Sequence, residues 1–186
     1  MPTYSLWLQP SGRCAAVLQE EIDRLSKEYG GPSFTPHVTL LGGFEAAEER
    51  EVLDKTMQLS QQLQPYTLHL EEVQAGTLYF QCVYVLVRQD AAVIEAWRQA
   101  CAAFSMPHGG QSYMPHLSLL YSDVDERIRR SVVDLASHRL HGAGVGTDAE
   151  LSEFSASALH LWETPEDKGV ASWRLIRSVP LQAAAV

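Results

Sequence analysis

The chain has 186 residues, of which 46% are hydrophobic and 20% are charged, and this balance excludes an intrinsically disordered protein. Fourteen Lys and Arg residues stand against 23 Asp and Glu residues, which gives a formal net charge of −9. This charge argues against a broad surface for nucleic acid or anionic membrane, because such surfaces are basic. It leaves room for a small phosphate ligand in a local pocket.

Strand and helix patterns alternate along the first half of the chain. Leu18, Ile22 and Leu25 fall on one face of a predicted helix that ends at the Gly30-Gly31-Pro32 sequence. The predicted elements are a strand at 4–8, a helix at 18–29, a strand at 34–41, a helix at 46–63, and strands at 66–73 and 77–87 around a turn at 75–76.

The second half continues the same alternation. It predicts a helix at 94–104, a loop at 105–112, a strand at 114–121, a helix capped by Ser122 or Asp123, a flexible connection at 142–146, and a final antiparallel pair at 152–162 and 170–179. Because hairpins are frequent and strands mix with helices, the pattern favours an α+β fold over a doubly wound parallel sheet.

The cysteines and the N-terminus indicate the cellular setting. Cys14, Cys82 and Cys101 have no metal-ligand spacing, and residues 1–5 lack the basic and apolar regions of a secretory signal. No apolar run approaches the ~20 residues that a membrane span needs. We therefore expect a cytoplasmic protein with reduced cysteines that does not engage a membrane.

One segment occurs twice. Residues 35–41 read TPHVTLL and residues 114–120 read MPHLSLL, so that His37 and His116 lie 79 residues apart (116 − 37). Internal similarity of this kind is typical of two copies of one supersecondary unit. We interpret residues 1–186 as one domain with two copies, at 37–39 and at 116–118.

The spacing within each copy has a direct structural meaning. Side chains alternate between the two faces of a strand, so His37 shares a face with Thr39, and His116 shares a face with Ser118. If the copies are related by a pseudo-twofold axis, two imidazoles and two hydroxyls converge on one cleft.

Those groups suit phosphoryl chemistry. Two imidazoles near neutral pH can act as a general acid and a general base, while hydroxyls can donate hydrogen bonds to phosphate oxygens. This chemistry needs neither a metal nor a cofactor, and we expect none.

At these residues the sequence resembles the two-histidine (2H) phosphoesterase superfamily, and within it the plant-type cyclic phosphodiesterases. Further matches are residues 4–7 (YSLW), 76–82 (GTLYFQC) and 113–121 (YMPHLSLLY). The resemblance implies a bilobal α+β fold, in which two pseudo-symmetric lobes, each with an antiparallel sheet and outer helices, enclose a central cleft.

The resemblance also implies an activity. The implied reaction is metal-independent hydrolysis of ADP-ribose 1″,2″-cyclic phosphate, a by-product of tRNA splicing, to ADP-ribose 1″-phosphate, and of nucleoside 2′,3′-cyclic phosphates to nucleoside 2′-phosphates. The implied partner is therefore a small nucleotide-like cyclic phosphate, and we expect a monomer that binds no long nucleic acid.

Carried onto this chain, the resemblance assigns a role to each residue of the repeat. The symmetric repeat does not distinguish the acid from the base. The family precedent favours His116 as the group that activates water and His37 as the group that protonates the leaving oxygen, and the phosphate would be held by Thr39 and Ser118. The cleft-lining aromatic residues implied by the resemblance are Trp7, Phe80 and Tyr121. Two other tryptophans, Trp162 and Trp173, are predicted to belong to the core of the final hairpin.

Three alternatives stay open at this point. The first is action on RNA 2′,3′-cyclic ends or 2′–5′ RNA ligation, as in ligase-like members of the superfamily. The second is a non-catalytic module that binds a nucleotide phosphate. The third concerns residues 105–113, including His108, which either cover the cleft or simply connect two elements.

His138 and His141 have no nearby carboxylate or cysteine, so no metal site is expected there.

Overall fold

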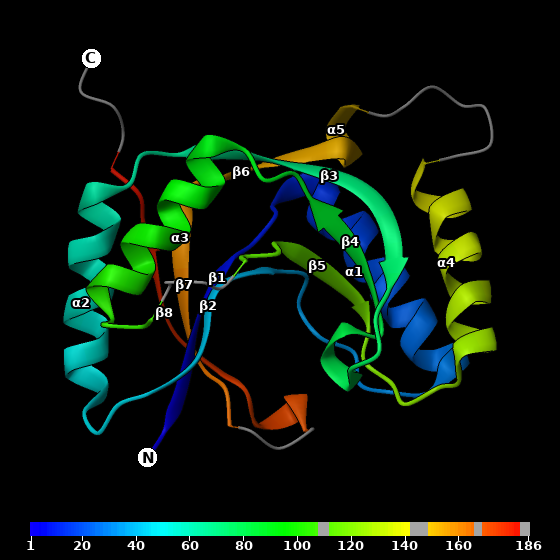
Figure 1. The fold of residues 1–186 in the computed structure, drawn as a ribbon, viewed down its shortest axis with the longest axis horizontal. Helices are drawn as coiled ribbons and strands as arrows, with labels where there is room; N and C mark the ends of the chain where they lie inside the picture. The colour runs from blue at the N-terminus through cyan, green and yellow to red at the C-terminus, as the bar shows by residue number, and fades with distance from the viewer. Residues whose placement is uncertain (108–111, 142–148, 166–168, 183–186) are drawn as a thin grey trace.

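Eight antiparallel strands form one continuous curled sheet in the computed structural model, which describes residues 1–107, 112–141, 149–165 and 169–182 (Figure 1). The strands are β1 (Thr3–Leu8), β2 (Val38–Glu45), β3 (Tyr66–Ala75), β4 (Val83–Val87), β5 (His116–Leu120), β6 (Glu153–Ala156), β7 (Ala158–Glu163) and β8 (Arg174–Pro180). Their order in the sheet is β6-β3-β4-β5-β2-β1-β7-β8.

Helices cover the sheet in two pairs. The described helices are α1 (Gly12–Tyr29), α2 (Glu49–Gln62), α3 (Ala91–Ala103), α4 (Glu126–His141) and the short α5 (Ala149–Ser152), with 3-10 turns η1 (Tyr79–Gln81) and η2 (Val170–Ser172). α1 packs on β5 and α4 on β3, whereas α2 packs on β7 and β8 and α3 on β2, so that each pair serves one half of the sheet (Figure 1).

The two halves meet at a single rung between β2 and β5, where Val38 pairs with Leu117. Both side chains are fully buried and belong to the hydrophobic core. The α+β class is confirmed, but the expectation of a separate sheet in each lobe is wrong. The two repeat strands pair with each other, and this pairing joins the two sheets into one.

The sheet is curled because its ends are connected through one residue. β6 and β7 stand at the first and seventh places of the strand order, yet only Ser157 separates them in the chain. Successive Cα atoms are about 3.8 Å apart, so these two places must lie close together. The prediction of one strand at 152–162 is therefore wrong: the chain leaves β3 at Ala156 and joins β1 and β8 from Ala158.

Several further boundaries differ from the prediction, and the strand predicted at 34–41 lies at Val38–Glu45. The strand predicted at 77–87 begins only at Val83, because the chain first folds back through η1, and a Cβ at Gly76 would lie 2.2 Å from the Gln81 carbonyl oxygen. Residues 170–172 form η2, although the predicted hairpin of the last two strands is confirmed. The cap of α4 is Asp125, which accepts a hydrogen bond from the Ile128 amide at 2.9 Å.

The interior follows the sequence pattern. Cys14, Leu18, Ile22 and Leu25 form the buried stripe of α1, and Cys14, Cys82 and Cys101 are all buried and free of disulfide bonds.

In the described part of the chain, no helix is both long and apolar enough to cross a membrane. The predicted connection at 142–146 and residues 108–111, with His108, lie outside the described residues.

Candidate active site

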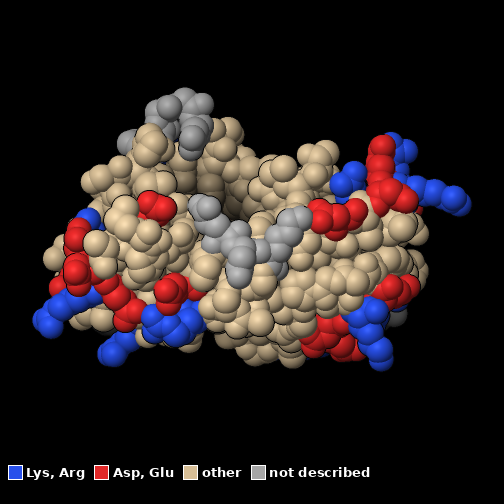
Figure 2. Space-filling model, turned by 90° about the horizontal axis from the view of Figure 1, so that it is seen from below, with Lys and Arg blue, Asp and Glu red and all other residues tan. Residues whose placement is uncertain are grey.

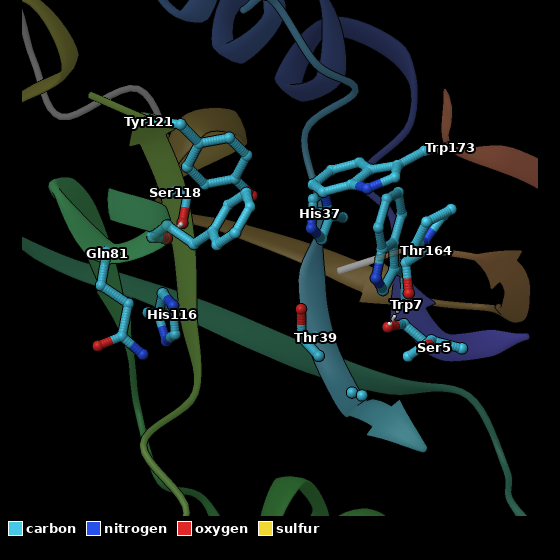
Figure 3. A pocket seen from close by; sticks show the side chains of 15 residues that line it. Ser5, Trp7, His37, Thr39, Gln81, His116, Ser118, Tyr121, Thr164 and Trp173 are labelled. Atoms are coloured by element: carbon cyan, nitrogen blue, oxygen red, sulfur yellow. Dashed lines mark hydrogen bonds between the residues drawn. The ribbon is translucent and has the colours of Figure 1, made fainter. Parts of the chain in front are cut away.

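The two copies of the repeat lie side by side in the middle of the sheet. Extending the antiparallel register from the Val38–Leu117 rung places Thr39 opposite His116 and His37 opposite Ser118. Since Val38 and Leu117 point into the core, these four polar side chains share the other face of the sheet. There they line one cavity of about 360 Å³, as the sequence predicts (Figure 3).

Each motif histidine is held by the same backbone contact. His37 Nδ1 lies 2.7 Å from the Thr35 carbonyl oxygen, and His116 Nδ1 lies 2.9 Å from the Met114 carbonyl oxygen. A carbonyl oxygen only accepts hydrogen bonds, so Nδ1 carries the proton and donates it. Nε2 of each neutral ring is therefore the basic nitrogen. In both copies a proline precedes the histidine and fixes the local φ angle.

His37 is the more buried of the two histidines. Only 5% of its surface is exposed, and its ring stacks on Trp7 with 3.6 Å between ring centroids and 9° between planes. Burial lowers the pKa of His37 to about 4, despite the opposing effect of the hydrogen bond to the Thr35 carbonyl. His37 is therefore neutral at pH 7 in the ligand-free protein.

His116 has a more open environment. Its ring is partly exposed and lies 5.1 Å from the ring of Tyr84. Burial also lowers the pKa of His116, and the hydrogen bond to the Met114 carbonyl opposes this shift. A proton on His116 lowers the pKa of His37 further, because the two positive charges repel each other. The two histidines thus titrate as a coupled pair.

The hydroxyl groups complete the central part of the cavity. Ser118 Oγ donates to the Phe80 carbonyl oxygen at 3.1 Å, and it also hydrogen-bonds the Tyr121 side chain. Burial raises the pKa of Tyr121, which keeps this phenol protonated and able to donate. Figure 3 shows Thr39 on β2 and Ser118 on β5, diagonally across the cavity from each other.

Aromatic rings form one side of the cavity. Trp7, Phe80 and Tyr121, which the resemblance implies, all line it. Trp173 lines it as well, with its ring 5.3 Å from that of Trp7 and 6.0 Å from that of Tyr121. It packs against the core, as predicted, but is only partly buried and also faces the cavity. No pattern in its own segment distinguishes it. Trp162 stacks on Trp7 at 4.5 Å behind this wall.

Hydroxyl groups that the sequence analysis missed line another side. Ser5 Oγ and Thr164 Oγ1 lie 2.8 Å apart (Figure 3), and Thr3, Gly42 and Gly43 also belong to the lining. Thr3, Ser5 and Trp7 alternate along β1 with Tyr4, Leu6 and Leu8, which belong to the buried core. This period of two is a signal that could have identified Ser5.

The cavity lining carries no fixed charge among the described residues, since it contains no Lys, Arg, Asp or Glu. Figure 2 shows the molecule hollowed on one face, with mainly uncharged described residues around the hollow. In the described ranges, no three His, Cys, Asp or Glu side chains lie close enough together to hold a metal ion. No residue is therefore assigned to a metal or a cofactor.

Comparison with known proteins gives a consistent result. Residues 1–181 match the model of the family described as cyclic phosphodiesterase-like protein. The chain is 29% identical over 174 residues to a cyclic phosphodiesterase of Arabidopsis thaliana, covering 93% of this chain and 92% of the relative. It is 28% identical over 195 residues to a 2′,3′-cyclic-nucleotide 3′-phosphodiesterase of Phaeosphaeria nodorum, covering 93% and 96%.

Solved structures share the fold. The protein TT0787 of Thermus thermophilus superposes with a TM-score of 0.63 at 14% sequence identity, covering 98% of this chain and all of that one. Escherichia coli LigT, crystallised with phosphate, superposes with a TM-score of 0.58 at 13% identity, covering 97% of each chain. At these identities the likeness concerns the fold alone.

Proposed function

The chain belongs to the family of cyclic phosphodiesterase-like proteins, and from this membership we propose that its central cavity hydrolyses cyclic phosphodiesters without a metal ion. One observation carries the proposal. His37, Thr39, His116 and Ser118 share one cavity, and each histidine has its Nδ1 occupied by a backbone carbonyl and its Nε2 left basic. Two imidazoles and two hydroxyls are the groups that in-line hydrolysis of a phosphodiester requires.

The proposed substrates are ADP-ribose 1″,2″-cyclic phosphate and nucleoside 2′,3′-cyclic phosphates, with ADP-ribose 1″-phosphate and nucleoside 2′-phosphates as products. The names of the Arabidopsis and Phaeosphaeria relatives support this class. The aromatic side of the cavity supports it too, because stacking a base on an aromatic ring contributes about 1–3 kcal/mol in single-strand binders. An uncharged lining is compatible with a cyclic phosphate group, which itself carries a single negative charge.

In the proposed reaction, His116 Nε2 takes a proton from water while the water oxygen bonds to phosphorus. The bond from phosphorus to the ester oxygen on the opposite side breaks, and that oxygen receives a proton from His37 Nε2. Thr39 donates a hydrogen bond to a non-bridging oxygen, and Ser118 does the same when its hydroxyl turns from the Phe80 carbonyl oxygen to the phosphate. The partial exposure of His116 supports its role, because water reaches it and its lowered pKa keeps it neutral.

His37 must carry a proton to act as the acid, although its pKa is about 4 in the ligand-free protein. The negative charge of the bound phosphodiester raises the pKa of a neighbouring imidazole. Raising it from about 4 to neutrality needs about 4 kcal/mol of favourable interaction between imidazolium and phosphate.

The proposal is tested by incubating the purified protein with each candidate cyclic phosphate in the presence of chelator and following the products by phosphorus NMR. We expect the cyclic resonance to be replaced by that of a monoester. His37→Ala and His116→Ala should each lower turnover by roughly 10²–10⁴-fold. Undiminished turnover in both variants would refute the assignment, and activity that chelator abolishes and a divalent ion restores would overturn the metal-free mechanism.

A substrate whose leaving atom is sulfur distinguishes the acid from the base, because a thiolate leaves without protonation. With this substrate, His37→Ala should regain most of its activity and His116→Ala should not. The reverse result would exchange the two roles.

Action on RNA ends is the second candidate, but no observation on this chain favours it. The likeness to LigT concerns the fold, and the described lining offers no basic track for a polynucleotide. Comparing turnover of a mononucleotide cyclic phosphate with that of an oligonucleotide end decides between the two. Tight binding without turnover would instead favour the non-catalytic module.

A further inference from the structure

Beyond the Val38–Leu117 rung, a side chain also joins the two motif strands. The phenol of Tyr113 donates a hydrogen bond to the carbonyl oxygen of Thr39 at 2.8 Å. Thr39 belongs to the first motif, whereas Tyr113 lies three residues before His116 of the second. The bond therefore links the segment before His116 directly to the strand that begins just after His37.

Tyr113 spans the boundary between the two halves of the sheet. Its backbone leads into β5, but its ring stacks on Trp97 of α3, with 5.2 Å between centroids and 3° between planes. α3 packs mainly on β2, the strand of the other half, and less extensively on β3. The side chain is thus anchored in one half while its main chain belongs to the other.

This link acts where the strands are weakly joined. The pairing of β2 with β5 is one rung, whereas β1 and β2 pair at five positions and β4 and β5 at four. Backbone pairing alone therefore constrains the separation of His37 and His116 little. That separation decides whether both rings reach the same phosphoryl group, and a misplacement of about 1 Å can cost about 10²-fold in rate.

We propose that Tyr113 is a positioning residue, whose hydrogen bond to Thr39 sets the separation of the two histidine-bearing strands. The proposal rests on the hydrolytic function proposed above. Tyr113 itself is absent from the cavity lining, so its effect reaches the substrate through Thr39 and His116.

The test compares two phenol-to-phenyl changes. Tyr113→Phe keeps the ring on Trp97 and removes only the hydroxyl. Tyr66→Phe is the matched control, because Tyr66 is a nearby tyrosine whose buried hydroxyl has no hydrogen-bond partner among the described residues. We expect Tyr113→Phe to lower kcat roughly 10-fold with little change in KM, because misplacement affects the transition state more than binding. Tyr66→Phe should leave both constants unchanged.

A second measurement does not depend on activity. Amide hydrogen exchange at residues 37–41 and 116–120 should be faster in Tyr113→Phe than in the wild type, and unchanged in Tyr66→Phe. If the wild type hydrolyses no cyclic phosphate, the proposed function fails, while the exchange rates still test the link between the strands.

Two results would overturn the proposal. One is a Tyr113→Phe protein with the kcat and exchange rates of Tyr66→Phe. The other is a Tyr113→Phe protein that loses thermal stability but keeps its kcat, which would reduce Tyr113 to a packing role. Should Tyr113→Phe not fold, Trp97→Phe is the second variant, because it keeps the phenol of Tyr113 but replaces the indole on which that phenol stacks with a smaller ring. We expect the same loss of kcat and the same faster exchange, to a smaller degree. Wild-type values of kcat and exchange would overturn the proposal.

Discussion

At the scale of single residues, the two motif histidines share one hydrogen-bonding arrangement but occupy different environments. Both donate from Nδ1 to the carbonyl two residues earlier. His37 is stacked on Trp7 and nearly inaccessible, whereas His116 is partly exposed. An internal repeat has therefore produced two groups with related geometry and unequal access to water.

The lowered pKa values of both histidines predict the pH dependence of kcat/KM, which reflects the free protein. One histidine must be neutral and the other protonated, and the protonated form is lost as pH rises above its pKa. The expected profile of kcat/KM against pH is bell-shaped. Because burial lowers the pKa of both histidines, the alkaline limb of this profile should lie below the ordinary histidine pKa of about 6.5. The profile of kcat should extend to higher pH, since bound phosphate favours the imidazolium. A kcat/KM optimum above about pH 7.5, a full unit beyond that ordinary value, would contradict this.

The hydroxyls of the two motifs allow a second prediction at this scale. Thr39→Val and Ser118→Ala should each lower kcat/KM roughly 10–10²-fold, because a hydrogen bond to a charged group contributes about 1.5–3 kcal/mol. Steady-state kinetics on a nucleoside 2′,3′-cyclic phosphate measure this. Thr56→Val is the control, since Thr56 donates to the Val52 carbonyl within α2 and does not line the cavity. Unchanged kinetics in both motif variants would remove the phosphate-binding role.

At the scale of elements, the loop after α1 fixes the end of β5 beside the cavity. Gly31 has a φ angle of +128°, and a Cβ added to it would lie 2.2 Å from the carbonyl oxygen of Tyr121. Tyr121 follows β5 directly and lines the cavity, and its ring also stacks on Phe34 at 3.8 Å. The close backbone approach at Gly31 thus helps to place a wall of the site.

Substitution of this glycine should be costly for a defined reason. Gly31→Ala must shift the backbone of Tyr121, so it should lower the free energy of unfolding by more than Gly30→Ala. Gly30 also has a positive φ angle, +73°, with ψ 147°, but its Cβ would meet no atom within 4 Å, which leaves only about 1–3 kcal/mol of backbone strain. Urea unfolding of the two variants measures the difference. Equal free energies of unfolding would show that the backbone at Tyr121 shifts to accommodate the added Cβ without loss of stability.

At the scale of the whole molecule, one imidazole buried between the two halves makes stability depend on pH. The pKa of His37 is about 4 in the folded protein and about 6.5 in an unfolded chain, so the unfolded state binds the proton more strongly. The resulting stability is complete above about pH 6.5 and is lost as the pH falls toward 4. From these values the loss is about 2 kcal/mol at about pH 5.

This loss can be isolated by substitution. The free energy of unfolding of the wild type should fall between about pH 7 and about pH 5 by about 2 kcal/mol more than that of His37→Gln, which has no imidazole to protonate. Urea titrations at the two pH values test this. Parallel pH dependences in the two proteins would show that His37 is protonated as easily in the folded state as in the unfolded one.

Errors of the sequence-based prediction arose where the chain changes direction. The apolar run at 77–87 has the composition of a strand, but its first part turns through η1 because Gly76 permits a close approach to Gln81. The run at 152–162 looks continuous, but Ser157 separates a strand on β3 from a strand on β1. Periodicity describes neighbours in the chain and does not report which distant strand is the partner.

What the sequence determined alone is the content of each motif: a strand whose histidine and hydroxyl share one face, because side chains in a strand alternate with a period of two. The tertiary structure decided that Val38 meets Leu117, which opposes His37 to Ser118 and Thr39 to His116 in one cavity. It also brought Trp173, Ser5 and Thr164 to that cavity and buried His37 more deeply than His116. These outcomes depend on contacts between segments far apart in the chain, whose packing no local pattern specifies.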